Sequence, residues 1–501
     1  MSEQQTTGAA NTVLGTGGLI FNEPLLWEKG KKGRMGMSVP QSDVPAATLD
    51  ATLEGTEVDF PDLSEVDVVR HYTRLSQWNF GVDSGMYPLG SCTMKYNPKT
   101  NERQAATPAI ALAHPMLEEG LSQGTLRLLY ELQEFLATIT GLDAVSLQPA
   151  AGAHGELTGM LIFHAYHEHK GHQRHKILIP DTAHGTNPAS AALCGYKAVA
   201  VKSGPDGMLD PELVASLMDE DTAGIMLTNP NTLGLFEERV REIAEIVHAK
   251  GGLVYGDGAN MNAVMGVMDA KKCGVDVLHL NLHKTFSTPH GGGGPGAGPV
   301  CVTKELEPFL PVPRAVRKGD SYQLEENLPL SVGRVHAFHG NFGVLVKAYS
   351  YILTMGAEGL KRASQLAVLN ANYIKEQLKD VLHLPYDRPC MHECVFSDQN
   401  QQAEKISTLD MAKRLIDYGY HPPTIYFPLV VHGAMMIEPT ESECKEDIDQ
   451  FIATLRTIVQ EAKEQPDLLH EAPQRTKVRR LDEVQAARCP CLVGLPSAED
   501  K

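Results

Sequence analysis

The chain has 501 residues, of which 42% are hydrophobic, and it contains 45 glycines and 31 prolines. This length is too great for one ordinary core and predicts two domains with extensions. The 62 acidic residues outnumber the 44 basic ones, and the net charge of −18 disfavours general affinity for nucleic acid or anionic membranes. No apolar run reaches the ~20 residues of a membrane span, and the first residues lack the pattern of a signal peptide. We therefore expect a cytoplasmic α/β protein.

The first 80 residues show no sustained hydrophobic period and contain glycine-rich and proline-rich stretches. Such a segment cannot bury itself, so residues 1–80 are predicted to form an extended arm that lies on a partner. The polar segment 84–101 follows, and its composition alone is typical of a loop. From 117 to 140, apolar residues recur at helical spacing and predict a helix that faces the core.

Short apolar strands then alternate with helical patterns. This alternation predicts a mostly parallel sheet with helices on both faces, in a large domain spanning 81–340. A long helical pattern from 342 to 379 leads into a smaller C-terminal α+β domain with a tail, 341–501, with strands near 393–397 and 434–437 and helices at 408–418 and 441–464. In the large domain the strands are expected at 145–147, 176–180, 199–201, 224–227, 253–257, 277–282 and 300–303.

Small residues follow the first of these strands. Ala151, Gly152 and Ala153 precede a helix that is expected from about Leu157, and small residues at a helix N-terminus expose backbone N–H groups to an anion such as a phosphate. The strand 176–180 delivers further polar residues, including His184 and Thr186, to the same carboxyl edge of the sheet.

The strand expected at 253–257 ends in an acid, Asp257, and the strand expected at 277–282 leads to a lysine, Lys284. A glycine-rich run from 291 to 298 follows the lysine. Ligands bind open α/β sheets at the carboxyl edge of the strands. A buried lysine is desolvated, which frees its neutral amine to attack a carbonyl. A carboxylate that keeps a pyridine nitrogen protonated completes the pair that pyridoxal 5'-phosphate (PLP) requires. The pair therefore predicts a PLP site with Lys284 as the covalent anchor, and Thr228, Asn229 and Asn260 are alternative partners for the ring hydroxyl.

Several motifs together resemble the fold-type I PLP enzymes and, among them, the PLP-bearing subunit of the two-subunit glycine-cleavage P-protein family. The resemblance spans about half of the chain, and its motifs are YPLGSCTMKYNP (87–98), LQPAAGAHGE (147–156), IPDTAHGTNP (179–188), DGAN (257–260) and HKTF (283–286).

The resemblance implies roles for individual residues. It implies that His154 lies flat against the pyridine ring, with Ala259 against the opposite face, and that His283 or His184 handles protons. It also implies that the segment 87–98 lies at the active site, where it offers Ser91, Thr93, Lys95 and Asn97 to the phosphate or to the substrate carboxylate.

The resemblance also implies the reaction and the partners. Glycine is the expected substrate, CO2 is released, and the aminomethyl group passes to the lipoyl disulfide of the glycine-cleavage H-protein. The expected protein partner is the other P-protein subunit, subunit 1, with two copies of each subunit in the assembly.

Three other hypotheses remain open. A fold-type I aminotransferase or an ordinary amino-acid decarboxylase would also use Asp257 and Lys284, although neither explains the segment 87–98. A non-catalytic scaffold subunit is disfavoured because this chain has both residues.

A metal site is not expected. His164, His167, His169, His172 and His175 follow one another closely, but they face several directions and lack an adjacent set of carboxylates or cysteines. The nine cysteines, which include Cys489 and Cys491 near the end of the chain, form neither a disulfide framework nor a zinc pattern.

Overall fold

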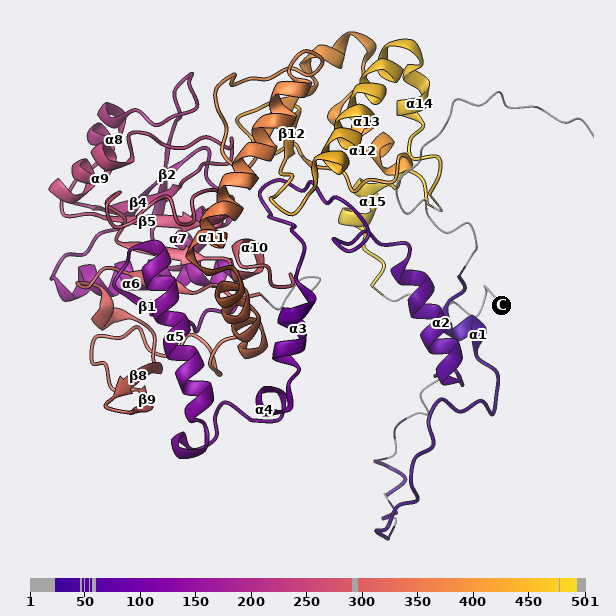
Figure 1. Ribbon diagram of the computed structural model, residues 1–501, viewed down its shortest axis with the longest axis horizontal. Coiled ribbons are helices and arrows are strands. Elements are labelled where there is room, and N and C mark those ends of the chain that lie inside the picture. The colour runs from indigo at the N-terminus through magenta and orange to yellow at the C-terminus, as the bar shows by residue number, and fades with distance from the viewer. Residues whose placement is uncertain are drawn as a thin grey trace, which may run out of the picture.

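The computed structural model describes residues 23–45, 47–48, 50–53, 55, 60–290, 296–476 and 478–492. The start of the expected arm, 1–22, and most of the expected glycine run, 291–295, lie outside the described residues. The body of the molecule consists of a large α/β part and a smaller part built from the C-terminal third of the chain, and α11 (Phe342–Leu378) runs between them (Figure 1).

A seven-stranded sheet in the order β1-β7-β6-β5-β4-β2-β3 forms the centre of the large part. The neighbouring pairs from β3 across to β6 are parallel, and β7 runs antiparallel to both β6 and β1. The expected mostly parallel sheet is thereby confirmed. Its strands are β1 (Ala144–Ser146), β2 (Lys176–Pro180), β3 (Lys197–Val201), β4 (Thr222–Thr228), β5 (Leu253–Gly258), β6 (Val277–Leu280) and β7 (Val300–Val302).

Helices cover both faces of this sheet, because successive strand residues point to opposite sides. In β4, Ile225 joins one hydrophobic core with α5 and α9, whereas Met226 joins a second core with α6. Val254 and Tyr255 of β5 divide between the two cores in the same way. Strands buried on both faces are continuous apolar runs, which is why their positions were predictable. The flanking helices are α5 (Gln123–Thr140), α6 (Gly152–His169), α7 (Thr186–Leu193), α8 (Pro211–Leu217) and α9 (Val240–Ala249).

The smaller part contains a three-stranded sheet in the order β10-β12-β11 and its own hydrophobic core. The long helix α11 belongs to both parts, because Val344 lies in the core of the large sheet and Ile374 in the core of the small one. The division of the chain at 340 stays a prediction. The other elements here are β10 (Cys394–Ser397), β11 (Thr424–Ile425), β12 (Ala434–Ile437), α12 (Thr408–Asp417), α13 (Lys445–Glu464), α14 (Pro466–His470) and α15 (Glu483–Arg488).

Three local predictions differ from the structure. The helix expected from 441 begins at Lys445, with Cys444 as its N-cap. The proline-rich connection after β7 contains a hairpin, β8 (Arg314–Lys318) and β9 (Ser321–Glu325). The arm contains α1 (Leu26–Lys29) and α2 (Glu65–Ser76), where an extended chain was expected.

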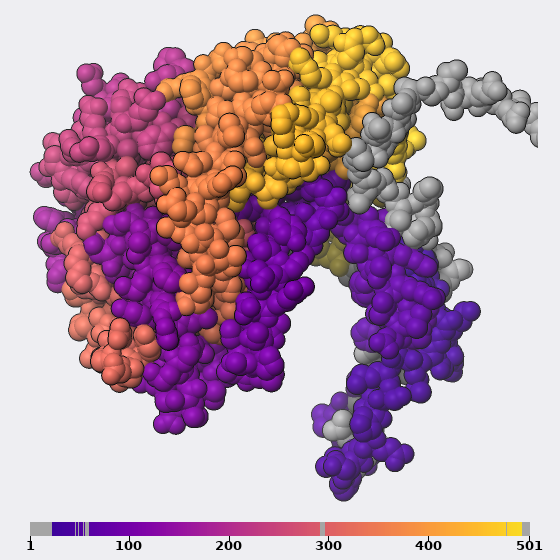
Figure 2. All heavy atoms as spheres, in the orientation of Figure 1, coloured from indigo at the N-terminus to yellow at the C-terminus, as the bar shows by residue number. Residues whose placement is uncertain are grey.

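The helix α2 was missed because its start signal is a polar capping box, in which the Ser64 hydroxyl accepts a hydrogen bond from the backbone N–H of Asp67. Its apolar residues Val66, Val69 and Tyr72 are exposed rather than packed in a core. Figure 2 shows the arm standing away from the body of the molecule.

The remaining described elements are short. None of the helices in the described ranges is long and apolar enough to cross a membrane. The short elements are α3 (Lys99–Ala105), α4 (Pro108–Ala111), α10 (Leu282–Thr285) and the 3-10 helices Glu119–Leu121, Met261–Ala263, Glu307–Phe309 and Asp398–Glu404.

The kink in α11 gives a stability prediction. Gly356 has φ 60° and ψ 178°, a conformation that is almost exclusive to glycine. Gly356→Ala should lower the free energy of unfolding by about 1–3 kcal/mol, measured as a lower thermal midpoint. Gly343→Ala in the same helix is the matched control, because the added Cβ meets nothing within 4 Å, and it should be neutral or slightly stabilising. Equal loss in both variants would contradict a role for the kink.

Candidate active site

The carboxyl ends of β2, β4, β5 and β6 open into one cavity of about 260 Å³. This is the edge at which the sequence predicted a ligand site. The residues that line the cavity are Ser91, Ala151, Gly152, Ala153, Glu156, His184, Thr186, Thr228, Thr232, Asp257, Ala259, Asn260, Asn281, His283 and Lys284.

Lys284 lies on the short helix α10, which follows β6 directly. Its side chain is 8% exposed, and its Nζ donates a hydrogen bond to the carbonyl oxygen of Ser91 at 3.0 Å. Ser91 belongs to the polar segment that precedes the large sheet in the chain. A primary amine is therefore held in a largely buried cavity by one neutral acceptor.

Asp257 lies at the end of β5 and is 2% exposed. Its Oδ1 accepts a hydrogen bond from the backbone N–H of Ala259 at 2.9 Å. The Nε2 atom of His279, on the neighbouring strand, lies 3.5 Å from the same oxygen. His279 Nδ1 is in turn 2.5 Å from the Tyr255 hydroxyl. These buried neighbours fix the orientation of the carboxylate.

The helix α6 begins at Gly152, and no side chain caps its N-terminus. Ala151, Gly152 and Ala153 line the cavity, so the first backbone N–H groups of an 18-residue helix face the ligand position. The N-terminus of a helix attracts anions through these N–H groups and through its dipole. Close packing keeps the turn in place, since a Cβ on Gly298 would lie 1.9 Å from the carbonyl oxygen of Ala151.

The donor set fits PLP. Lys284 supplies the amine, Asp257 supplies a carboxylate for a ring nitrogen, and the start of α6 supplies an anion site. Two buried atoms at this cavity, Thr228 Oγ1 and Asn281 Oδ1, have no hydrogen-bond partner among the described residues. Buried polar groups without partners are costly, and a polar ligand would satisfy them.

Two ionisable neighbours have altered pKa values. Burial raises the pKa of Glu156 to about 7, with a further contribution from Asp257. Glu156 accepts a hydrogen bond from the hydroxyl of Thr186 at 2.8 Å. Burial, followed by His290, lowers the pKa of His283 to about 3. His283 is thus a neutral imidazole at physiological pH, able to accept a proton but not to act as a resident cation.

Most of the predicted site residues meet in this cavity, but His154 and Asn229 are not among those that line it. His154 Nδ1 accepts the backbone N–H of Ala150 at 3.1 Å, which holds the ring beside its own helix start. The Asn229 side chain bonds the backbone of Glu237, because Asn229 lies past the last residue of β4. The roles of His154 and Asn229 at the cofactor stay predictions.

The segment 87–98 also differs from expectation in detail. Ser91 lines the cavity, but Thr93 donates to Glu438 at 2.6 Å and Lys95 forms an ion pair with Glu441 at 2.6 Å. Asn97 bonds the carbonyl oxygen of Lys95. These three side chains have partners within the chain instead of facing a ligand.

Sequence reasoning missed Glu156, Thr232 and Asn281 as lining residues. Glu156 was inside a quoted motif, and Asn281 immediately precedes α10, but nothing in their spacing distinguished them from residues that pack in the core. Thr232 follows β4 in a loop, and its hydroxyl donates to the carbonyl oxygen of Thr182.

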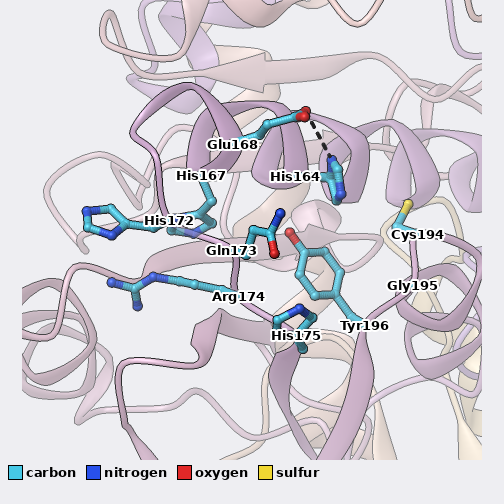
Figure 3. Close-up of a pocket in the computed structure, with 10 residues that line it drawn as sticks. All are labelled: His164, His167, Glu168, His172, Gln173, Arg174, His175, Cys194, Gly195 and Tyr196. Carbon is cyan, nitrogen blue, oxygen red and sulfur yellow. Dashed lines mark ion pairs between the residues drawn. The ribbon is translucent and has the colours of Figure 1, made fainter.

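The histidine-rich stretch lines a different cavity, away from Lys284, with Glu168, Arg174, Cys194 and Tyr196. Figure 3 shows its imidazoles pointing in different directions. His167 Nε2 lies 2.9 Å from the carbonyl oxygen of Ala223, and His175 Nδ1 lies 2.6 Å from Asp221. These contacts give the histidines separate partners in the fold. Among the described residues, one group of three side chains places potential metal-ligand atoms, imidazole nitrogens or carboxylate oxygens, within 4.8 Å of one another. This group is His392, Glu393 and Glu438.

Comparisons with known proteins are specific. Residues 363–477 match the family model "Glycine dehydrogenase, C-terminal domain", and residues 156–313 match "Aminotransferase class-V". A protein of Caldanaerobacter subterraneus named "Probable glycine dehydrogenase (decarboxylating) subunit 2" is 58% identical over 474 residues, which cover 93% of this chain and 98% of the relative. A relative of the same name from Listeria innocua is 55% identical, with 94% and 97% covered.

Two solved structures share the fold. One is titled as a glycine decarboxylase (P-protein) of the glycine cleavage system in inhibitor-bound form; it superposes with a TM-score of 0.69 at 19% identity and covers 82% of this chain and 93% of that one. A cysteine desulfurase from Thermococcus onnurineus gives a TM-score of 0.60 at 17% identity, with 75% and 95% covered. At these identities the likeness concerns the fold alone.

The low pKa of His283 predicts how stability depends on pH. The unfolded chain takes up a proton on this imidazole below about pH 6.5, whereas the folded chain does not. Stability therefore falls as the pH drops from about 6.5 towards 3, by at most about 1.4 kcal/mol per unit for this group. Between about pH 7 and pH 5, the thermal midpoint of His283→Gln should fall by less than that of the parent chain.

The matched control is His169→Gln, because His169 is exposed. This variant should keep the pH dependence of the parent chain. If His283→Gln followed the same curve as His169→Gln, the imidazole of His283 would not be held neutral by burial.

Proposed function

The chain belongs to the family of glycine dehydrogenase (decarboxylating) subunit 2, and we propose that it catalyses the PLP-dependent decarboxylation of glycine with transfer of the aminomethyl group to the lipoyl disulfide of the glycine-cleavage H-protein. In this reaction glycine loses CO2, and its remaining carbon forms a bond to one sulfur of the disulfide. The electron pair left by CO2 forms that bond, and the second sulfur is released as a thiol. The enzyme class is therefore an oxidoreductase with a lipoyl-protein acceptor.

The observation that carries this proposal is the meeting of Lys284, Asp257 and the start of α6 in one cavity. When bound, PLP supplies a ring that accepts the electron pair released as the carboxylate of glycine leaves. In the proposed arrangement Lys284 forms the covalent attachment, Asp257 holds a proton on the ring nitrogen, and the N–H groups of Ala151, Gly152 and Ala153 bind the phosphate.

The other residues have orienting and proton-handling roles in this proposal. Ala259 leaves room for a flat ring beside Asp257, and Thr228 and Asn260 remain alternatives for the ring hydroxyl. Asn260 already donates to the carbonyl oxygen of Pro230 at 2.9 Å, whereas the Thr228 hydroxyl has no partner among the described residues. That contrast favours Thr228. His283 and His184, which both line the cavity, remain alternatives for the proton-handling role.

The name "subunit 2" of the relatives implies a partner subunit, and the arm of this chain offers a surface for it. The apolar side chains of the arm are exposed over a long stretch that stands away from the body (Figure 2). Exposed apolar surface of this kind marks an interaction site. We propose that subunit 1 covers it, in an assembly of two copies of each subunit that works in the cytoplasm. The most exposed members are Met35, Met37, Val39, Leu53 and Phe60.

Replacing the anchor lysine tests the cofactor site. Lys284→Ala removes the primary amine, so the purified protein should lose the yellow absorbance of the lysine-linked cofactor and its trapping by borohydride. Lys284→Arg should behave in the same way, because it restores the charge but not the primary amine. Lys375→Met is the matched control, since Lys375 is also a buried lysine but lies on α11. Retention of both signals in Lys284→Ala would assign the link to another lysine.

The acceptor and the partner are tested by exchange of labelled CO2 into the carboxyl group of glycine. We expect slow exchange with the isolated chain and a steep rise when subunit 1 and lipoylated H-protein are both added. Unlipoylated H-protein should yield no aminomethyl product, because it lacks a sulfur electrophile.

The alternatives give different outcomes in this assay. An ordinary decarboxylase would release free amine without either protein, and an aminotransferase would consume a 2-oxo acid. Full exchange by the isolated chain would contradict the need for subunit 1, and aminomethyl transfer to unlipoylated carrier would contradict the lipoyl mechanism.

A further inference from the structure

Two glutamates meet in the interior of the smaller part, close to the active site. Glu393 immediately precedes β10 and Glu438 immediately follows β12, and these strands pair antiparallel with Cys394 opposite Ile437. The register therefore places the two glutamates side by side. Both are 0% exposed, as is the adjacent His392.

Each carboxylate has one neutral donor and one oxygen without a partner. Glu393 Oε2 accepts the backbone N–H of Ser91 at 2.7 Å, and Glu438 Oε1 accepts the hydroxyl of Thr93 at 2.6 Å. Glu393 Oε1, Glu438 Oε2 and both ring nitrogens of His392 have no hydrogen-bond partner among the described residues. One ligand atom from each of the three side chains lies within 4.8 Å of the others.

Among the described residues, no lysine or arginine nitrogen lies within 4.0 Å of the carboxylate oxygens of Glu393 or Glu438. The one histidine contact within this distance joins His392 Nε2 to Glu393 Oε2 at 3.8 Å. Burial lowers the pKa of His392 to about 3, so this imidazole is neutral. Two adjacent ionised carboxylates without a cation are unfavourable in a buried site, and one of them retains a proton instead.

Ser91 connects the pair to the active site. Its φ of 62° is in the left-handed region, which is uncommon for a residue other than glycine. Glu393 holds the N–H of this residue, and the carbonyl oxygen of the same residue accepts the hydrogen bond from Lys284 at 3.0 Å. The preceding carbonyl, of Gly90, is held by the hydroxyl of Thr424 at 2.6 Å. The turn that receives the lysine is thus fixed by the smaller part of the molecule.

We propose that Glu393 and Glu438 share one proton and that this pair, with one net negative charge, positions the amine of Lys284 through the Ser91 turn. Both glutamates are positioning residues: Glu393 acts on the lysine through Ser91, and Glu438, which holds Thr93 in the same segment, acts through the proton it shares with Glu393. The proposal rests on the anchor role of Lys284 given above, whereas the shared proton depends on this cluster alone.

The pKa values agree with this arrangement. Burial raises the pKa of Glu393 to about 7, and burial followed by the charge of Glu393 raises the pKa of Glu438 well above its usual range. Lys284 opposes both shifts. The other titratable groups that face the pair are His392, Glu441, Cys92, Cys390 and Cys394.

The shared proton predicts a pH-dependent stability. The folded chain holds this proton at a pH where the unfolded chain has released it, so stability falls as the pH rises from about 4.5 to about 7 and beyond. Glu438→Gln imitates the protonated carboxyl and removes the contribution of Glu438 to this dependence. Its thermal midpoint, relative to the parent chain, should be higher at about pH 8 than at about pH 5. Glu393→Gln should do the same, because either glutamate can hold the proton.

The pH midpoint of the cofactor absorbance distinguishes an effect on the position of Lys284 from an effect on stability alone. Each single variant keeps one negative charge, so the pH midpoint of the yellow absorbance of the Lys284-linked cofactor should stay close to that of the parent chain. The double variant Glu393→Gln with Glu438→Gln has no charge and should move that midpoint to lower pH by about one unit. Glu443→Gln is the matched control: burial raises the pKa of Glu443 to about 7, but Glu443 has no contact with Ser91, so it should change the stability profile alone.

The contrary outcomes are distinct. A stoichiometric divalent metal in the purified full chain, with a thermal midpoint that falls on chelation, would make the cluster a metal site and overturn the shared proton. Stability profiles parallel to that of the parent chain in both single variants would also overturn it, as would failure of both to fold at either pH. An unmoved absorbance midpoint in the double variant would overturn the link to Lys284. Absence of yellow colour in the parent chain would instead contradict the cofactor proposal itself.

Discussion

The parallel pairing of β5 and β6 is the constraint on which the site depends. The register of this pair places Asp257 opposite His279. Lys284 lies on the short helix α10 that follows β6. Both strands are buried on both faces, so the positions of the carboxylate and the amine are set by the packing of the sheet rather than by a flexible loop. A cofactor that needs an acid and an amine at opposite ends of one ring requires this rigidity.

A second constraint comes from outside the sheet. The segment 88–98 lies between the two parts of the molecule: Leu89 bridges to Ile437, and the buried ammonium of Lys95 reaches Glu441, Asn262 and Tyr351. Asn262 follows the Asp257 loop, and Glu441 follows β12. The same segment therefore connects the loop beside Asp257 with the small sheet, and it contributes Ser91 to the cavity. Movement of the smaller part would therefore displace groups that contact Lys284 and the loop after Asp257.

The sequence was informative where burial imposes a pattern and uninformative where distant polar groups meet. The strand that ends before Lys284 and the strand that ends in Asp257 are apolar runs followed by a single polar residue. This pattern predicted the fold and the meeting of these two residues at one edge of the sheet. Thr93 and Lys95 belong to an equally polar segment, but their partners lie 345 and 346 residues away in the chain. No local pattern identifies Glu438 and Glu441 as those partners, so both residues looked available to a ligand.

Helix starts show the same difference. The helix expected from about Leu157 begins earlier, at Gly152, where small residues follow the strand. His154 accepts the backbone N–H of Ala150, and its place against the ring, which rests on the resemblance, stays a prediction. The arm helix α2 was missed because several of its apolar side chains, Val66, Val69 and Tyr72, are exposed, so it lacks the buried stripe that usually identifies a helix.

The fold itself does not determine the reaction. The same architecture occurs in the structure titled as a cysteine desulfurase. What differs must lie in the groups that surround Lys284 and Asp257. In this chain those groups include a left-handed turn at Ser91, whose N–H is held by the buried Glu393, and the neighbouring Thr93, whose hydroxyl is held by the buried Glu438. Chemistry specific to this family is therefore to be sought where the N-terminal segment, the small sheet and Lys284 meet, rather than in the sheet that all these proteins share.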